Sequence, residues 1–110
     1  MKPFRTYIFE FDKNEKKVLL SFSKQVLKQI QGDNRFFSQE KAFNSIIVKL
    51  NEDGENVKFT KDEYYKLSNQ LKENLKYLKG KAEKGFILIR LLYRSVYLQY
   101  KNLVENHFSE

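Results

Sequence analysis

Cysteine is absent from this sequence, histidine occurs once and glycine occurs four times. Without cysteine the chain can form no disulfide, no thiolate nucleophile and no cysteine-based zinc site, which fits a reducing cytoplasm. The single histidine, His107, lies three residues from the end of the chain, where a proton-transfer group is poorly held. The glycines are isolated, so neither a phosphate-binding loop nor a dinucleotide fingerprint is present. We therefore expect a protein that is not an enzyme and that uses neither a metal ion nor a cofactor.

Long hydrophobic runs are missing as well. The longest apolar stretch, residues 86–104, is interrupted by Arg90, Arg94 and Lys101, each of which would cost about 3 kcal/mol at the centre of a bilayer. The first residues lack the apolar core of a secretory signal, because Glu10 and Asp12 follow too early. The sequence therefore predicts no membrane span and a cytoplasmic location.

Positive charge and aromatic side chains are abundant. The 110 residues carry a net charge of +7 and include ten phenylalanines and seven tyrosines, and 41% of the chain is hydrophobic. This length and composition predict a single domain with one core over residues 1–110. A basic chain attracts nucleic acid, acidic proteins and anionic membrane surfaces. A lysine-rich solvated surface without any ligand would have the same composition.

The first part of the chain has two interpretations. Residues 5–11 alternate, with Tyr7, Phe9 and Phe11 on one side, which is typical of a strand. Polar residues 12–16 then resemble a hairpin loop, and the alternation over residues 17–23 predicts a second strand, with a short helix over residues 24–31. A helix over the same segment remains the alternative, because apolar residues at helical spacing precede Gly32, namely Leu19, Phe22, Val26 and Ile30.

A second hairpin and two helices are predicted after it. Asp53-Gly54 is a turn dipeptide between strands expected near residues 44–50 and 55–59. Thr60 and Glu63 have the spacing of a capping box, so a helix is expected over residues 61–79, and a second helix over residues 85–107. The predicted fold class is α+β, with residues 1–60 mainly β. An antiparallel four-stranded sheet of two hairpins is followed by two C-terminal helices packed on one face.

The second predicted helix has two apolar stripes, and each stripe needs something to bury it. One stripe fits the core of the protein itself. The other stripe is the predicted contact face for a second copy or another partner, and consists of Phe86, Tyr93, Tyr97 and Val104.

Basic residues combined with aromatics are typical of proteins that bind single-stranded nucleic acid, because the cations neutralise phosphates and the rings stack on unpaired bases. Most aromatics here occupy periodic positions that are typical of a core. The exceptions are Phe36 and Phe37, which with Arg35 fall in a loop predicted over residues 32–41. These three residues are therefore candidates for ligand contact.

Two segments resemble a known family. RTYIFEFDKNEKKVLLSFSK resembles the opening hairpin of bacterial PUR-type domains, and NVKFTKDEYYKLSNQLKENLKYLK resembles their last strand and packing helix. The chain is thus similar, over about its first two thirds, to the PUR-domain and PC4-like single-stranded nucleic-acid-binding family. The resemblance implies a dimer that binds single strands across sheet and loops. It also implies Tyr7 or Phe36 as stacking residues, and phosphate contacts from Arg5, Lys17, Lys24, Lys49 and Lys58.

Two functions are compatible with these patterns. The first is a non-enzymatic nucleic-acid-binding protein that contacts single-stranded DNA or RNA through basic residues and aromatic stacking, as a homodimer. The alternative is a protein-interaction module, such as a small regulator or an immunity-type inhibitor, that engages an acidic protein partner through an apolar face of the C-terminal helix.

Overall fold

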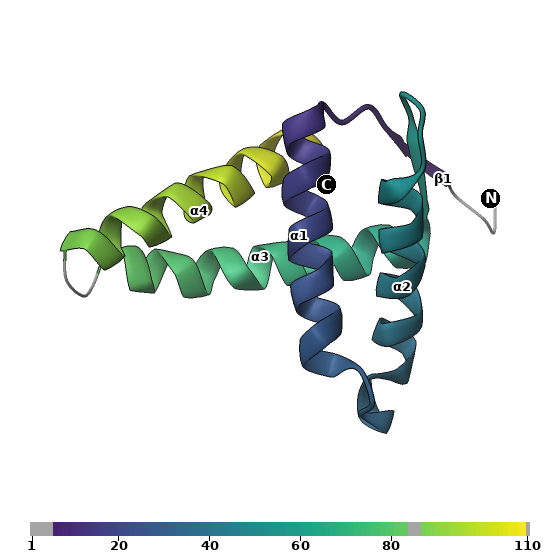
Figure 1. The fold of residues 1–110 in the computed structure, drawn as a ribbon, viewed down its shortest axis with the longest axis horizontal. Coiled ribbons are helices and arrows are strands. Elements are labelled where there is room, and N and C mark those ends of the chain that lie inside the picture. The colour runs from purple at the N-terminus through teal and green to yellow at the C-terminus, as the bar shows by residue number, and fades with distance from the viewer. Residues whose placement is uncertain (1–5, 84–86, 110) are drawn as a thin grey trace. The chain divides into compact units, whose positions relative to one another are not determined.

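Helices dominate the structure. The computed structural model describes residues 6–83 and 87–109 (Figure 1). Its elements are strand β1 (Thr6–Phe9), helix α1 (Lys13–Ile30), the 3-10 turn η1 (Asn34–Phe36), helix α2 (Phe37–Asn51), strand β2 (Val57–Thr60), helix α3 (Lys61–Glu83) and helix α4 (Ile87–His107). The chain forms two compact units, Met1–Leu67 and Ser68–Glu110, and α3 contributes residues to both.

The sheet of the first unit differs from the predicted one. Over the described residues it has two strands, β1 and β2, which pair antiparallel with Tyr7 opposite Phe59 and Ile8 opposite Lys58. Because α1 and α2 lie between these strands in the sequence, the strands do not form a hairpin. The predicted four-stranded sheet of two hairpins is therefore wrong. The description α+β fits only loosely, since the described residues form four α-helices and one small sheet.

The alternation predicted for the first strand is present and builds an aromatic core. Tyr7 and Phe9 are buried, whereas Ile8 between them is 61% exposed. The ring of Tyr7 stacks on that of Tyr64 with 4.0 Å between centroids, and Phe9 lies 5.7 Å from Phe59. Burying such large rings contributes much of the stability of a small unit.

Residues 13–30 form one helix, so the predicted second strand is wrong and the helical alternative is correct. The helix begins with a capping box: Asp12 accepts from the amide of Glu15 at 2.7 Å, and the Glu15 carboxylate accepts from the amide of Asp12 at 3.1 Å. Its buried side chains are Leu19, Phe22, Ser23 and Val26. After the helix, Gly32 adopts a φ of 83°, which glycine tolerates at a helix C-terminus.

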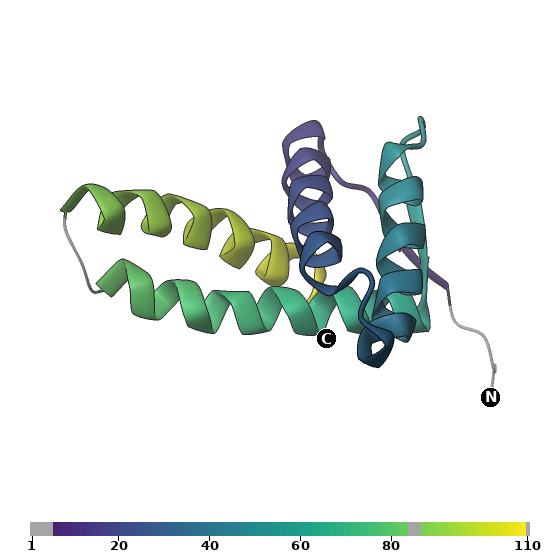
Figure 2. The same ribbon diagram turned by 60° about the horizontal axis from the view of Figure 1, so that its bottom comes forward.

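Residues 44–50, predicted as a strand, belong to α2. The spacing of its buried residues, Ala42, Phe43, Ile46 and Leu50, is helical. Figure 1 and Figure 2 show α1 and α2 side by side, joined by the short segment that contains η1. The turn at Asp53-Gly54 leads from α2 into β2, and the Lys16 ammonium donates to the carbonyl of Gly54 at 3.2 Å.

The second unit contains most of α3 and all of α4. α3 begins directly after Thr60, the residue expected to cap it. α4 returns in the direction opposite to α3 (Figure 2). The buried side chains described in this unit are Ser68, Leu71, Leu78, Tyr100, Leu103 and Phe108. Over the described residues, none of the helices combines the length and the apolar character that crossing a membrane requires.

Candidate nucleic-acid interface

One face of α1 consists of exposed basic and polar side chains. With about 3.6 residues per turn, positions 13, 17, 21, 24 and 28 fall within one narrow sector of a helix. All five side chains are exposed, on the side opposite the buried Leu19, Phe22 and Val26. We call this surface the lysine face, and it consists of Lys13, Lys17, Ser21, Lys24 and Lys28.

All the charges on the lysine face are positive. The one acidic residue of α1, Glu15, belongs to the capping box on another side of the helix. Within the described parts of the chain, no carboxylate forms an ion pair with any of the four lysines. Over about 22 Å of helix, at about 1.5 Å per residue, the ammonium groups are therefore available to an anionic ligand.

The structure separates the basic residues predicted to contact phosphate. Lys17 and Lys24 lie together on the lysine face, while Lys58 is exposed on β2 opposite Ile8. Lys49 already forms an ion pair, because its ammonium lies 2.5 Å from the carboxylate of Glu63. Arg5 lies outside the described residues. The two remaining lysines of the face, Lys13 and Lys28, were not predicted as site residues.

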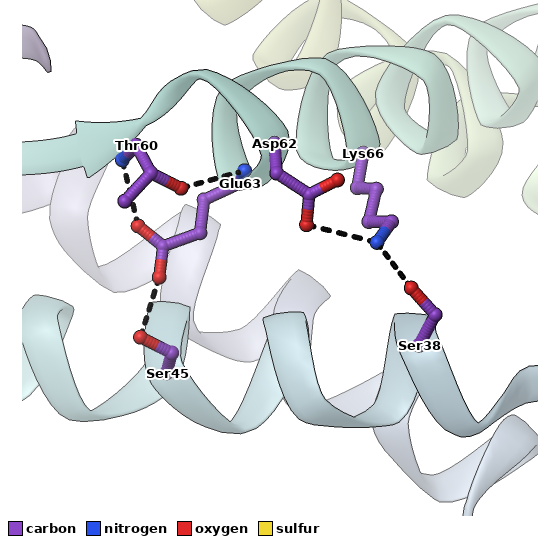
Figure 3. A network of polar contacts seen from close by, with 6 residues as sticks. All are labelled: Ser38, Ser45, Thr60, Asp62, Glu63 and Lys66. Carbon is purple, nitrogen blue, oxygen red and sulfur yellow. Dashed lines mark hydrogen bonds and ion pairs between the residues drawn. The ribbon is translucent and has the colours of Figure 1, made fainter. Parts of the chain in front are cut away.

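A polar network centred on Glu63 holds Lys49 in place. The Glu63 side chain is only 7% exposed, and its carboxylate accepts from the hydroxyl of Ser45, from the ammonium of Lys49 and, at 2.8 Å, from the amide of Thr60. The Thr60 hydroxyl accepts from the amide of Glu63 at 3.2 Å, which completes the predicted capping box (Figure 3). The network therefore ties α2 to the first turn of α3 and has a structural role.

The protonation of Glu63 follows from this environment. Burial raises the pKa of Glu63, but hydrogen bonds from Lys49, Ser45 and Thr60 and the positive charge of Lys49 outweigh burial. The net result is a pKa below the ordinary value of a glutamate. Because the folded pKa lies below the unfolded value of about 4.3, ionised Glu63 stabilises the fold above that pH.

We expect Glu63→Gln to lower the free energy of unfolding by about 2 kcal/mol at pH 7, since the amide keeps the shape but loses the charge-assisted hydrogen bonds. This difference should shrink as the pH falls below about 4.3 and through the lowered pKa, where the wild-type carboxylate becomes protonated. Urea unfolding of both proteins between pH 7 and pH 3 measures it. A difference that stays constant with pH would show that the charge of Glu63 is not what stabilises the network.

A second polar contact links the starts of α2 and α3. The Lys66 ammonium donates to the Ser38 hydroxyl at 2.6 Å and to the Asp62 carboxylate at 2.8 Å (Figure 3). An activated serine needs a neighbour that accepts its proton. Here Lys66 acts as a donor and pairs with Asp62, so this arrangement is an ion pair extended by a hydroxyl. Among the described residues, no cluster of three or more histidine or acidic side chains could hold a metal ion.

The loop predicted over residues 32–41 is wrong, since Arg35 and Phe36 lie in η1 and Phe37 begins α2. The three side chains have different environments. Arg35 donates to the Asp33 carboxylate at 2.8 Å, and its guanidinium lies 5.4 Å from the centre of the Phe36 ring. The Arg35 side chain hydrogen bond holds the pKa of Asp33 below its usual value. Phe36 is half-buried, whereas Phe37 is 67% exposed. Tyr7, the other predicted stacking residue, is buried against Tyr64 and presents no ring to a ligand.

The predicted partner face of the C-terminal helix is described only in part. Tyr97 and Val104 are half-buried in α4. Phe86 and the side chain of Tyr93 lie outside the described residues. Only two of the four side chains are therefore described, and the partner face stays a prediction.

Comparisons with protein-family models, curated proteins and solved structures found no match. Nothing in them bears on the resemblance to PUR-domain and PC4-like proteins, which stays a prediction. They also contain nothing that supports nucleic-acid binding or a dimer, so a function can be based only on the lysine face.

Proposed function

We propose that this protein binds nucleic acid without catalysing a reaction, and that the lysine face of α1 contacts the phosphate backbone. The observation that carries the proposal is the row of four exposed lysines on one side of a rigid helix, without an acidic residue among them. Lysine side chains neutralise phosphates and release the counterions condensed around them. Contacts of this kind position a protein on the polymer but do not read its sequence.

The chemistry of the face favours nucleic acid over the other polyanions. An interfacial helix inserts apolar residues beside its basic ones, and a protein interface is usually anchored by apolar or aromatic side chains. Among its own five residues the lysine face has neither, since Ser21 is its only uncharged member. An elongated array of cations that lacks an apolar anchor fits the evenly charged backbone of a nucleic acid. The cysteine-free composition supports a cytoplasmic site of action.

Binding should weaken steeply as salt is added. On single strands the logarithm of the association constant falls with a slope of about −0.7 per phosphate neutralised, so four lysines predict a slope of about −3 against the logarithm of the salt concentration. Fluorescence anisotropy of a labelled single-stranded oligonucleotide, from low to near-physiological salt, measures this slope. Absent binding, or binding that salt does not weaken, would contradict the proposal.

A further inference from the structure

Phe37 is an exposed aromatic ring at the first position of α2. Its side chain is 67% exposed, the highest value among the large hydrophobic residues of the described chain. One helical turn later Lys41 is exposed, and Asn44 is exposed on the same side. The buried residues of α2 lie opposite. This face of α2 therefore offers an open ring with a cation and an amide beside it.

Phe37 follows the C-terminal end of the lysine face along the chain. The last two lysines of that face, Lys24 and Lys28, lie in the final turns of α1, and residues 31–36 lead directly from α1 to Phe37 (Figures 1 and 2). The start of α1 is close to the acidic turn of residues 52–55, since the Lys16 ammonium contacts the carbonyl of Glu52 at 3.4 Å. Phe37 therefore lies toward the end of α1 that is away from this acidic turn.

The neighbouring side chains leave Phe37 as the open ring. Phe36 is half-buried and has the guanidinium of Arg35 over its face, and Arg35 is in turn held by Asp33. Arg35 therefore already has an anionic partner, and Phe36 already has a cation on its ring. Phe37 has the exposed area to accept a flat ligand.

We propose that an unpaired base of single-stranded nucleic acid stacks on Phe37 while the adjoining phosphates contact Lys24, Lys28 and Lys41. This inference rests on the proposed function and adds to it a preference for single strands. A duplex keeps its bases stacked inside and contributes only phosphates to such a surface. Base stacking on aromatic side chains tolerates any sequence, because every base has a flat face.

A Phe37→Trp variant reports stacking directly, because the natural chain contains no tryptophan. We expect a short thymidine oligonucleotide to quench the emission of this indole, whereas an abasic strand with the same number of phosphates binds without quenching it. Val48→Trp is the matched control, since Val48 is 59% exposed at the other end of α2. Equal quenching of both variants, or no quenching of Phe37→Trp by the bound oligonucleotide, would overturn the stacking.

Phe37→Ala tests how much the stacked base contributes to the affinity for single-stranded nucleic acid. A stacked base is worth about 1–3 kcal/mol, so affinity for the thymidine oligonucleotide should fall about 5- to 150-fold while affinity for the abasic strand stays unchanged. If Phe37→Ala leaves both affinities unchanged or lowers them equally, the inference is wrong but binding through the lysine face is not contradicted. If the wild-type protein binds neither strand, the proposed function fails and the inference fails with it.

Discussion

The double variant Lys17→Glu and Lys24→Glu is expected to bind single-stranded nucleic acid about 100- to 1,000-fold more weakly than the wild-type protein at low salt. A lysine near an anionic surface contributes about 1 kcal/mol, and reversing its charge replaces this attraction with a repulsion of similar size. Two reversals therefore change the binding free energy by about 4 kcal/mol, and each 1.4 kcal/mol corresponds to a tenfold change in affinity. Anisotropy titration of the same labelled oligonucleotide measures the difference.

The matched control reverses two exposed lysines elsewhere. Lys76→Glu with Lys79→Glu changes the net charge by the same amount on α3, in the second unit. Circular dichroism checks that both double variants keep their helices. If the control lowers affinity as much as the variant of the lysine face, the attraction comes from the net charge of the chain and the proposed surface is wrong.

Phe59→Ala is expected to lower the free energy of unfolding of the first unit by about 3–5 kcal/mol. The Phe59 ring is fully buried and lies 5.7 Å from the ring of Phe9 and 6.4 Å from the ring of Phe11. Removing it loses the transfer free energy of the ring and leaves a cavity among rigid aromatic neighbours. Many small domains have only 5–15 kcal/mol of stability in total, so this variant should be largely unfolded in low urea.

Lys58→Ala is the matched control, since Lys58 is the preceding residue of β2 and is exposed. It should change the free energy of unfolding by no more than about 0.5 kcal/mol. Urea unfolding followed by circular dichroism compares the two variants. A small effect of Phe59→Ala would show that the aromatic core between the sheet and the start of α3 contributes little to stability.

Two capping boxes of the same kind show how much of the fold the sequence reveals. The pattern at Thr60 and Glu63 correctly predicted the start of α3. The equivalent pattern at Asp12 and Glu15 starts α1, although the polar composition of residues 12–16 predicts a hairpin loop. Residues 17–23 alternate as well as they follow helical spacing, so periodicity alone could not decide. The cap was the local feature that could have decided it.

The error at residues 44–50 has a different cause. Ile46, Ile47 and Val48 form a short apolar run beside a turn dipeptide, which is typical of a buried strand. In the structure Ile46 is buried, Ile47 is half-buried and Val48 is 59% exposed. The three side chains therefore point to different sides of one helix. The turn at Gly54 is real, but it connects a helix to a strand.

The candidate site was predictable only in part, because it depends on the fold. Lys17 and Lys24 were predicted, but their alignment with Lys13 and Lys28 exists only once residues 13–30 are a helix. Lys49 was predicted as a phosphate contact, but it pairs with Glu63, which belongs to another element and follows 14 residues later in the sequence. Sequence spacing does not reveal such a pairing, since it depends on how α2 and the first turn of α3 pack in the first unit.

The most direct test of the account is to map the nucleic-acid contact on the protein by nuclear magnetic resonance. At 13.3 kDa, the protein is small enough for its amide and side-chain signals to be followed while a single-stranded oligonucleotide is added. We expect shifts concentrated on Lys17, Ser21, Lys24 and Lys28 of α1, together with the ring of Phe37. Shifts that leave the lysine face unchanged, or that centre on α4, would contradict it.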